Sequence, residues 1–126
     1  MDMKKFITFV LLCSSAVFAF GAELSASSKA EIDSLLTALE SSQCQFYRNG
    51  SWYSASEARA HLKQKYDYLV NASQIANAEE FISAAATKSS MSGEPYQVGC
   101  PGQTPQASAV WIGNELQRLR ALRAYR

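Results

Sequence analysis

Apolar residues recur with helical spacing in four separate stretches of the chain, which predicts amphipathic helices with one face on a core. The first stretch places Ile32, Leu35, Leu36 and Leu39 on one face. Ser28 with Glu31 matches a capping box, so we expect this helix over 29–42.

The second and third helices begin with the same kind of signal. Ser54-Ala55-Ser56-Glu57 is another capping box, and the helix that it opens ends near Asn71. Its inward positions are Ala55, Ala58, Leu62, Lys65 or Tyr66, and Leu69. Asn77 caps a short third helix, whose apolar positions are Phe81, Ile82, Ala85 and Ala86.

A last helix is expected after a turn-rich segment. Residues 87–95 are small, polar and rich in turn formers, which predicts a loop. Thr104 can cap the last helix, with Pro105 at its first position. The apolar positions of this helix are Val110, Trp111, Ile112, Leu116, Leu119 and Leu122.

The sequence between the first two helices predicts a β-hairpin. Asn49-Gly50 separates two aromatic-rich runs, and both residues tolerate the positive φ of a type I′ turn. We expect Phe46 and Trp52 to form a cross-strand pair on one face. The alternative is that Asn49-Gly50 forms only a loop tip. Because a lone hairpin is marginal in water, a third strand is needed, and 96–100 is the best candidate.

These elements together predict an α+β fold, with about four helices packed on a small antiparallel sheet made of the hairpin plus a third strand. The sequence shows no internal repeat, no low-complexity tract and no sign of a second domain.

The N-terminus has the layout of a secretory signal peptide. Lys4 and Lys5 give a positive start, and the apolar run over 6–20 is too short for a stable membrane helix. We expect cleavage after Gly21, which leaves a signal peptide, 1–21, and a single globular domain, 22–126. A retained anchor is the alternative. The mature protein is then periplasmic or secreted, without stable membrane insertion.

The charge of the mature chain argues against a nucleic-acid partner. Removing 1–21 takes Lys plus Arg from 12 to 10 and Asp plus Glu from 11 to 10, so the remainder is nearly neutral. The last helix is locally basic through Arg118, Arg120, Arg123 and Arg126. We attribute these arginines to the helix macrodipole, and association with a membrane surface is the alternative.

The cysteines predict one disulfide. Only Cys44 and Cys100 remain after signal cleavage, and an exported chain with one pair of cysteines usually joins them. The bond would enclose residues 45–99, and closing a loop of that length stabilises a fold by ~4 kcal/mol. The chain has no C-x-x-C motif, and its single histidine with two cysteines cannot form a structural zinc site. We therefore expect neither a metal nor a cofactor.

Four blocks of residues carry a resemblance to a known family. They are Phe46-Tyr47-Arg48-Asn49-Gly50, Glu57-Ala58-Arg59-Ala60-His61-Leu62, Ala78-Glu79-Glu80-Phe81-Ile82 and Ser89-Ser90-Met91-Ser92-Gly93-Glu94-Pro95-Tyr96. In this order and spacing the chain resembles the YfeK-like family of small exported bacterial proteins, over about 44–100. The resemblance implies a periplasmic or secreted domain of unknown function, and it brings no activity, cofactor or catalytic residue.

His61 and Glu57 are the candidates for catalysis. Glu57 precedes His61 by one helical turn, and a carboxylate in contact with an imidazole raises its pKa, as a general base requires. The sequence places no nucleophile or metal ligand beside this pair. We therefore expect a structural hydrogen bond for His61, and a small hydrolase using both residues is the alternative function.

Arg48 is the first candidate for ligand binding. It adjoins the expected turn, and its planar donor fork is suited to a carboxylate or a phosphate. The simpler expectation is a salt bridge, to Glu57 or to Glu79.

The loop before the third strand is the second candidate. Ser89, Ser90 and Gly93 can form a small nest of N–H groups for an anion, although an ordinary polar loop with positive φ at Gly93 is the preferred interpretation. The disulfide would bring this loop towards Arg48 and Asn49, with Tyr96 and Trp52 as flat walls. We therefore expect a non-enzymatic binding or envelope-associated protein, whose partner is an envelope protein or a small ligand.

Overall fold

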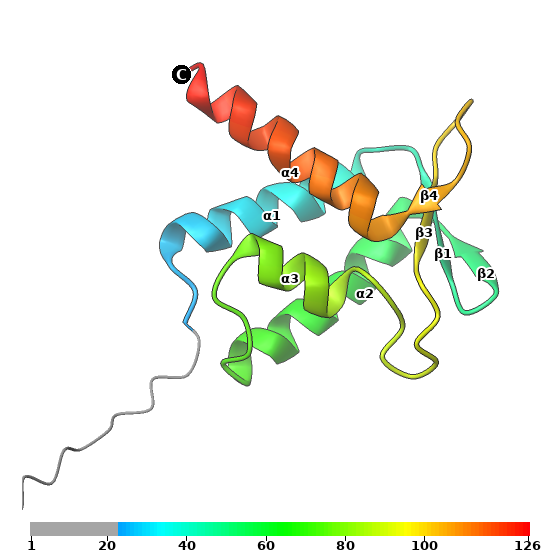
Figure 1. Ribbon diagram of the computed structural model, residues 1–126, viewed down its shortest axis with the longest axis horizontal. Helices are drawn as coiled ribbons and strands as arrows, with labels where there is room; N and C mark the ends of the chain where they lie inside the picture. Colours follow the sequence, from blue (N-terminus) through cyan, green and yellow to red (C-terminus); the bar gives the residue numbers. More distant parts are fainter. Residues whose placement is uncertain (1–22) are drawn as a thin grey trace, which may run out of the picture.

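The computed structural model describes residues 23–126, so the expected signal peptide and its cleavage site lie outside the described residues. The helices are α1 (Ala26–Glu40), α2 (Ala55–Asn71), α3 (Ala78–Ala85) and α4 (Ser108–Ala124). The strands are β1 (Gln45–Arg48), β2 (Ser51–Tyr53), β3 (Gln97–Gly99) and β4 (Gln106–Ala107). The helices gather on one side of the sheet (Figure 1), and the expected α+β class is confirmed.

The sheet has one strand more than the sequence predicts. Its order is β2-β1-β3-β4, and all neighbouring strands are antiparallel. β4 pairs with β3 through Gln97 opposite Ala107 and Val98 opposite Gln106. The expected start of the last helix at Thr104 and Pro105 is therefore wrong, because the residues that follow them extend the sheet first.

The hairpin forms as expected, but its register differs from the prediction. Asn49 and Gly50 have φ values of 48° and 87°, so both central residues of the turn take positive φ. A turn of this length sets Tyr47 opposite Trp52, and Phe46 lies opposite Tyr53. The expected pairing of Phe46 with Trp52 is wrong, since these residues lie on opposite faces of the sheet.

The predicted disulfide is confirmed. Cys44 directly precedes β1, Cys100 directly follows β3, and the two are joined. The bond lies one position beyond the pairing of Gln45 with Gly99, so it closes the end of the central strand pair. The first hairpin strand and the third strand therefore act as one platform.

The helix caps are set by local polar side chains. Ser54 Oγ accepts from the Glu57 N–H at 3.2 Å and opens α2, as predicted. Asn77 opens α3 in the same way. The prediction is wrong for α1, whose N-cap is Ser25 rather than Ser28, so this helix begins three residues early.

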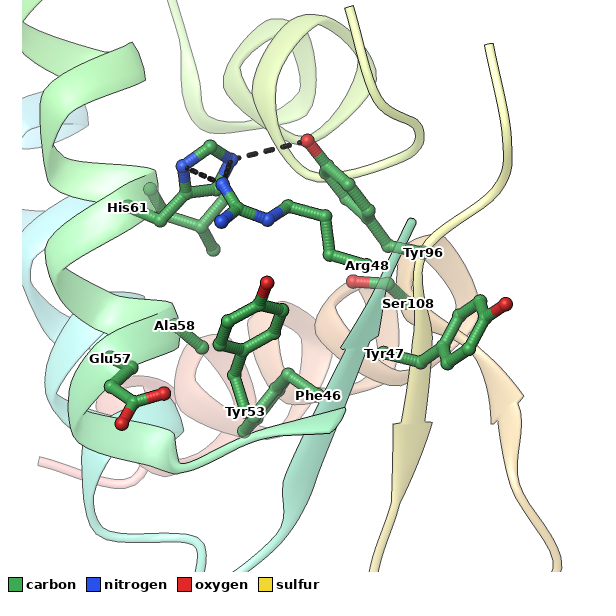
Figure 2. Close-up of a pocket in the computed structure, with 10 residues that line it drawn as sticks. Phe46, Tyr47, Arg48, Tyr53, Glu57, Ala58, His61, Tyr96 and Ser108 are labelled. Carbon is green, nitrogen blue, oxygen red and sulfur yellow. Dashed lines mark hydrogen bonds between the residues drawn. The ribbon is translucent and has the colours of Figure 1, made fainter. Parts of the chain in front are cut away.

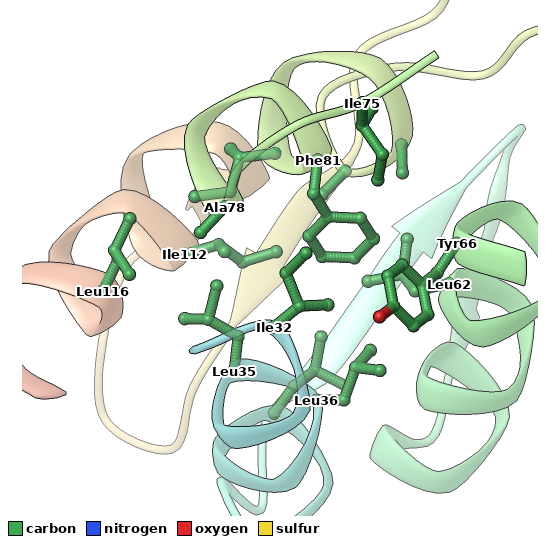
Figure 3. Packing of buried hydrophobic residues seen from close by; sticks show 14 of the residues in the cluster. Ile32, Leu35, Leu36, Leu62, Tyr66, Ile75, Ala78, Phe81, Ile112 and Leu116 are labelled. Carbon is green, nitrogen blue, oxygen red and sulfur yellow. The ribbon is translucent and has the colours of Figure 1, made fainter. Parts of the chain in front are cut away.

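The core lies between the four helices and the inner face of the sheet (Figure 3). Its fully buried large side chains are Ile32, Leu36, Leu39, Ile75, Phe81, Val98 and Leu116. α4 contributes chiefly Ile112 and Leu116, whereas Val110 and Leu122 are 54% and 53% exposed. Those two positions do not belong to the buried face that the sequence predicts for this helix.

The arginines of α4 join three helices. Glu31 of α1 accepts from Arg120 Nε at 2.7 Å and from Arg123 Nη2 at 2.6 Å. Arg120 also pairs with Glu79 of α3 at 2.5 Å. Hydrogen bonding to Arg120 is the main reason that the pKa of Glu31 falls from 4.5 to about 2. These arginines hold carboxylates of neighbouring helices, in addition to any effect of the helix macrodipole.

Candidate functional site

A cavity of about 260 Å³ opens between α2 and the inner face of the hairpin (Figure 2). The residues that line it are Phe46, Tyr47, Arg48, Tyr53, Glu57, Ala58, His61, Leu62, Tyr96 and Ser108. It therefore brings Arg48, His61 and Tyr96, from a strand, a helix and a connecting segment, to one concave surface.

The hairpin and α2 position these side chains together. Side chains alternate along a strand, so Phe46 and Arg48 point to the same face of β1. Tyr53, opposite Phe46, adds an aromatic ring to that face. Because α2 starts only two residues after Tyr53, its first turns pass over this face and bring Ala58 and His61 against it.

The guanidinium of Arg48 lies between the imidazole of His61 and the ring of Tyr53 (Figure 2). Its Nη1 atom is 2.6 Å from Nδ1 and 3.2 Å from Nε2 of His61, and its guanidinium carbon lies 4.8 Å from the centre of the Tyr53 ring. The expected salt bridge to Glu57 or Glu79 is wrong. Among residues 23–126 no carboxylate forms an ion pair with Arg48, and Glu79 pairs with an arginine of α4 instead.

The contact of Arg48 with His61 favours a neutral imidazole. Nη1 of the permanently charged guanidinium lies 2.6 Å from Nδ1 and 3.2 Å from Nε2, so a protonated ring would set two cations against each other. Nε2 also lies 3.2 Å from the Tyr96 hydroxyl oxygen, and Lys65 Nζ donates to that oxygen at 3.2 Å.

The surroundings of His61 favour its neutral form. Burial, and then the charges of Arg48 and Lys65, lower the pKa of His61 from 6.5 to about 4. Burial, and then the charge of Arg48, also lower the pKa of Lys65. Burial raises the pKa of the Tyr96 hydroxyl. A general base in partnership with Glu57 would require a raised pKa for His61, and the shift has the opposite sign.

Glu57 lines the cavity without touching His61. Its exposed side chain points away from the imidazole (Figure 2), and among the described residues no hydrogen bond joins the two. The expected contact of this pair is wrong, although the structural hydrogen bond expected for His61 is present. Within the same residues, the partners of the imidazole are Arg48 and Tyr96, with no serine, threonine or cysteine among them.

The loop before β3 adjoins the turn of the hairpin, as expected, but its own groups occupy its N–H donors. The buried Ser89 Oγ accepts from the N–H groups of Met91 and Ser92, both at 3.3 Å. Gly93 takes a φ of 73° and donates its N–H to the carbonyl oxygen of Ser89. The loop is therefore an internally bonded turn rather than an open nest.

Asn49 ties this loop to the hairpin. Its side-chain amide donates to Ser89 Oγ at 3.2 Å, and its Oδ1 accepts from Ser92 Oγ at 2.6 Å. Tyr47 adds a third link, through its hydroxyl to Glu94 at 2.9 Å. Ser90 is exposed and does not line the cavity. Asn49 and Ser89 therefore hold the loop to the hairpin, and a role for them in ligand binding stays a prediction.

Trp52 lies on the opposite face of the sheet from the cavity. Its ring centre is 5.4 Å from that of Tyr47, and the ring covers Gly99, where a Cβ would come within 3.1 Å of it. The expectation that Trp52 and Tyr96 are walls of one site holds only for Tyr96.

Two polar residues of the cavity lining, Tyr53 and Ser108, and Lys65 beside Tyr96 were not identified as site residues from the sequence. Tyr53 could have been found by counting outward from the turn, which places it opposite Phe46. Lys65 and the buried Ser108 carry no local signal, because the topology brings α2 and the start of α4 to the segment around Tyr96.

Neither a metal centre nor a membrane span is found in the described part of the chain. Residues 23–126 contain no cluster of three or more His, Cys, Asp or Glu side chains that could hold a metal ion. No helix in that range is long and apolar enough to cross a bilayer.

Comparison with known proteins places the chain beside others of unknown function. The model of a family of unknown function, DUF5329, matches residues 26–120. The uncharacterized protein YfeK of Salmonella typhimurium is 35% identical over 95 residues, which cover 75% of this chain and 77% of that protein. No solved structure matches the chain.

Proposed function

The chain belongs to this DUF5329 family of unknown function, and we propose that it is an exported, non-enzymatic domain that binds a small ligand in the cavity beside Arg48. The observation that carries the proposal is a guanidinium without a carboxylate partner among the described residues, held in a cavity walled by aromatic and aliphatic side chains. Convergent polar groups in an apolar pocket are the usual features of a ligand site.

Two features of the chain support export. The first 21 residues have the layout of a signal peptide, and the disulfide between Cys44 and Cys100 is typical of an oxidising compartment. We expect residues 22–126 to form the mature, single domain. Mass spectrometry of the protein from a periplasmic fraction should give a chain that begins at Ala22. A full-length chain retained in the cytoplasm would contradict export.

The hydrolase alternative has a specific weakness. A general base must take up a proton, and Nη1 of the permanently charged Arg48 lies 2.6 Å from Nδ1 and 3.2 Å from Nε2 of His61. Protonation of His61 would place a second cation against this guanidinium, so Arg48 would have to move away first. Binding needs no such rearrangement, so the geometry supports a binding site better than a catalytic one.

The test is to block the cavity from α2. Ala58→Phe places a large ring where a half-buried alanine lines the cavity, and Ala60→Phe adds the same ring on the exposed side of the same helix. Fragments screened by NMR against the wild-type protein should shift the resonances of Tyr53 and Leu62. Binding should survive in the Ala60→Phe variant and be lost in the Ala58→Phe variant. Fragments that bind elsewhere, or equally well to both variants, would refute the proposal.

A further inference from the structure

The residues around the cavity indicate the chemical class of its ligand, an inference that rests on the binding function proposed above. We propose that the ligand is a small monocarboxylate with a compact apolar body, its carboxylate held by Arg48 and the hydroxyl of Tyr96 and its body placed between Tyr53 and the apolar side chains of α2.

The charges around the cavity call for an anion. Arg48 lines the cavity and Lys65 contacts Tyr96 beside it, and among residues 23–126 neither cation forms an ion pair with a carboxylate. Arg59, Arg118, Arg120 and Arg123 all have carboxylate partners. A half-buried cation without a partner is costly, and a bound anion offsets that cost.

Arg48 and Tyr96 also have hydrogen-bond donors that a single ligand group could accept. Among the described residues Arg48 uses only Nη1, towards His61, so Nε and Nη2 remain for a ligand. The Tyr96 hydroxyl lies beside Arg48 in the cavity lining, and its oxygen already accepts from Lys65, so its O–H can donate to a bound ligand. A carboxylate has two oxygens and no proton, so it can accept from Arg48 and Tyr96 together.

The rest of the cavity limits the ligand to a single charge. Away from Arg48 the lining is apolar, formed by Phe46, Ala58 and Leu62. Among residues 23–126, Glu57 is the one acidic residue that lines the cavity, and it would repel a second negative charge. The volume of 260 Å³ equals about nine water molecules at ~30 Å³ each, so a ligand of roughly ten non-hydrogen atoms fits.

Phenylacetate and phenylacetamide are a matched pair of probes, equal in size and shape and different in charge. Calorimetric titration of the disulfide-bonded protein at pH 7 should show phenylacetate binding at least about tenfold more tightly, as expected for hydrogen bonds to a charged group. Inorganic phosphate should bind more weakly than phenylacetate. Arg48→Met should remove the preference for the acid, whereas Arg118→Met, at an exposed arginine of α4, should leave it unchanged.

The outcomes separate this inference from the proposed function. Equal binding of the acid and the amide, both lost in the Ala58→Phe variant, would overturn the ligand class and leave the binding site intact. Tighter binding of phosphate would overturn it as well. If Arg48→Met does not fold, as judged by circular dichroism, Tyr96→Phe serves in its place. This variant lacks the proposed hydroxyl donor, together with its contacts to His61 and Lys65, and an unchanged ratio of the two affinities would then refute the inference.

Discussion

The neutral state of His61 makes the stability of the protein depend on mildly acidic pH. The pKa of His61 is about 4 in the folded protein, against an ordinary value of 6.5. Between these pH values the unfolded chain binds a proton at His61 that the folded protein does not. The free energy of unfolding therefore falls as the pH falls from 6.5 towards 4.

The magnitude follows from the same pKa. A difference of one unit in pKa corresponds to about 1.36 kcal/mol. The shift of His61 from 6.5 to about 4 would therefore lower the free energy of unfolding by about 3 kcal/mol across this pH range. The imidazole is only half-buried, and solvent screening reduces the expected loss to roughly 1–2 kcal/mol. The loss arises mainly because burial disfavours the charged imidazole, and then because protonation places a cation beside Arg48 and Lys65.

Urea unfolding at intervals between pH 7.5 and 4 would measure this loss, with His61→Gln as the matched variant. The amide oxygen of glutamine can accept from Arg48 and its amino group can donate to Tyr96, but the side chain does not titrate. The wild-type protein should lose stability across the window, and the variant should lose less by about the amount worked out above. Equal pH profiles for the two proteins, or an NMR titration midpoint of His61 at or above 6.5, would refute the reasoning.

Three further predictions concern stability and the loop. Replacing Cys44 and Cys100 by serine should lower the free energy of unfolding by about 4 kcal/mol, and urea curves that coincide with those of the wild type would contradict this. Glu31→Gln should lower the free energy of unfolding by about 1–3 kcal/mol at pH 7, and it should reduce the loss of stability between pH 4.5 and 2. Glu115→Gln, which breaks an ion pair within α4, should lower it by under about 0.5 kcal/mol. Ser89→Ala should cost about 1–2 kcal/mol and speed hydrogen exchange in the loop, and unchanged exchange would mean that its hydroxyl does not hold the turn.

The helix starts that the sequence predicts correctly are those in which the capping rule has one candidate. Ser54 and Asn77 each stand alone at the right distance from an acidic residue, and each caps its helix. At α1 both Ser25 and Ser28 can cap, and the capping box favours Ser28. In the structure Ser25 caps the helix, and the adjoining Leu24 is buried in the core. The local signal therefore favours the wrong serine, and tertiary packing determines where the helix begins.

The errors in the sheet have two different origins. The mistaken pairing of Phe46 with Trp52 could have been avoided, because a two-residue turn fixes each partner by simple counting from Arg48 and Ser51. β4 could not have been found in that way. Its two residues are strand only because they pair with β3, and nothing in their own sequence distinguishes them from the start of a helix.

The salt bridge wrongly expected for Arg48 illustrates that the sequence does not show which carboxylates the fold brings to which arginines. By composition alone, a near-neutral chain offers a carboxylate for each arginine. In the fold, Glu79 and Glu31 are drawn to the arginines of α4, on the far side of the core, while Glu57 points away from Arg48. Within residues 23–126, pairing on one side of the fold therefore leaves Arg48 and Lys65 without carboxylate partners on the other. The separation of charge between the two sides, rather than the net charge, is the reason that we propose an anionic ligand for the cavity.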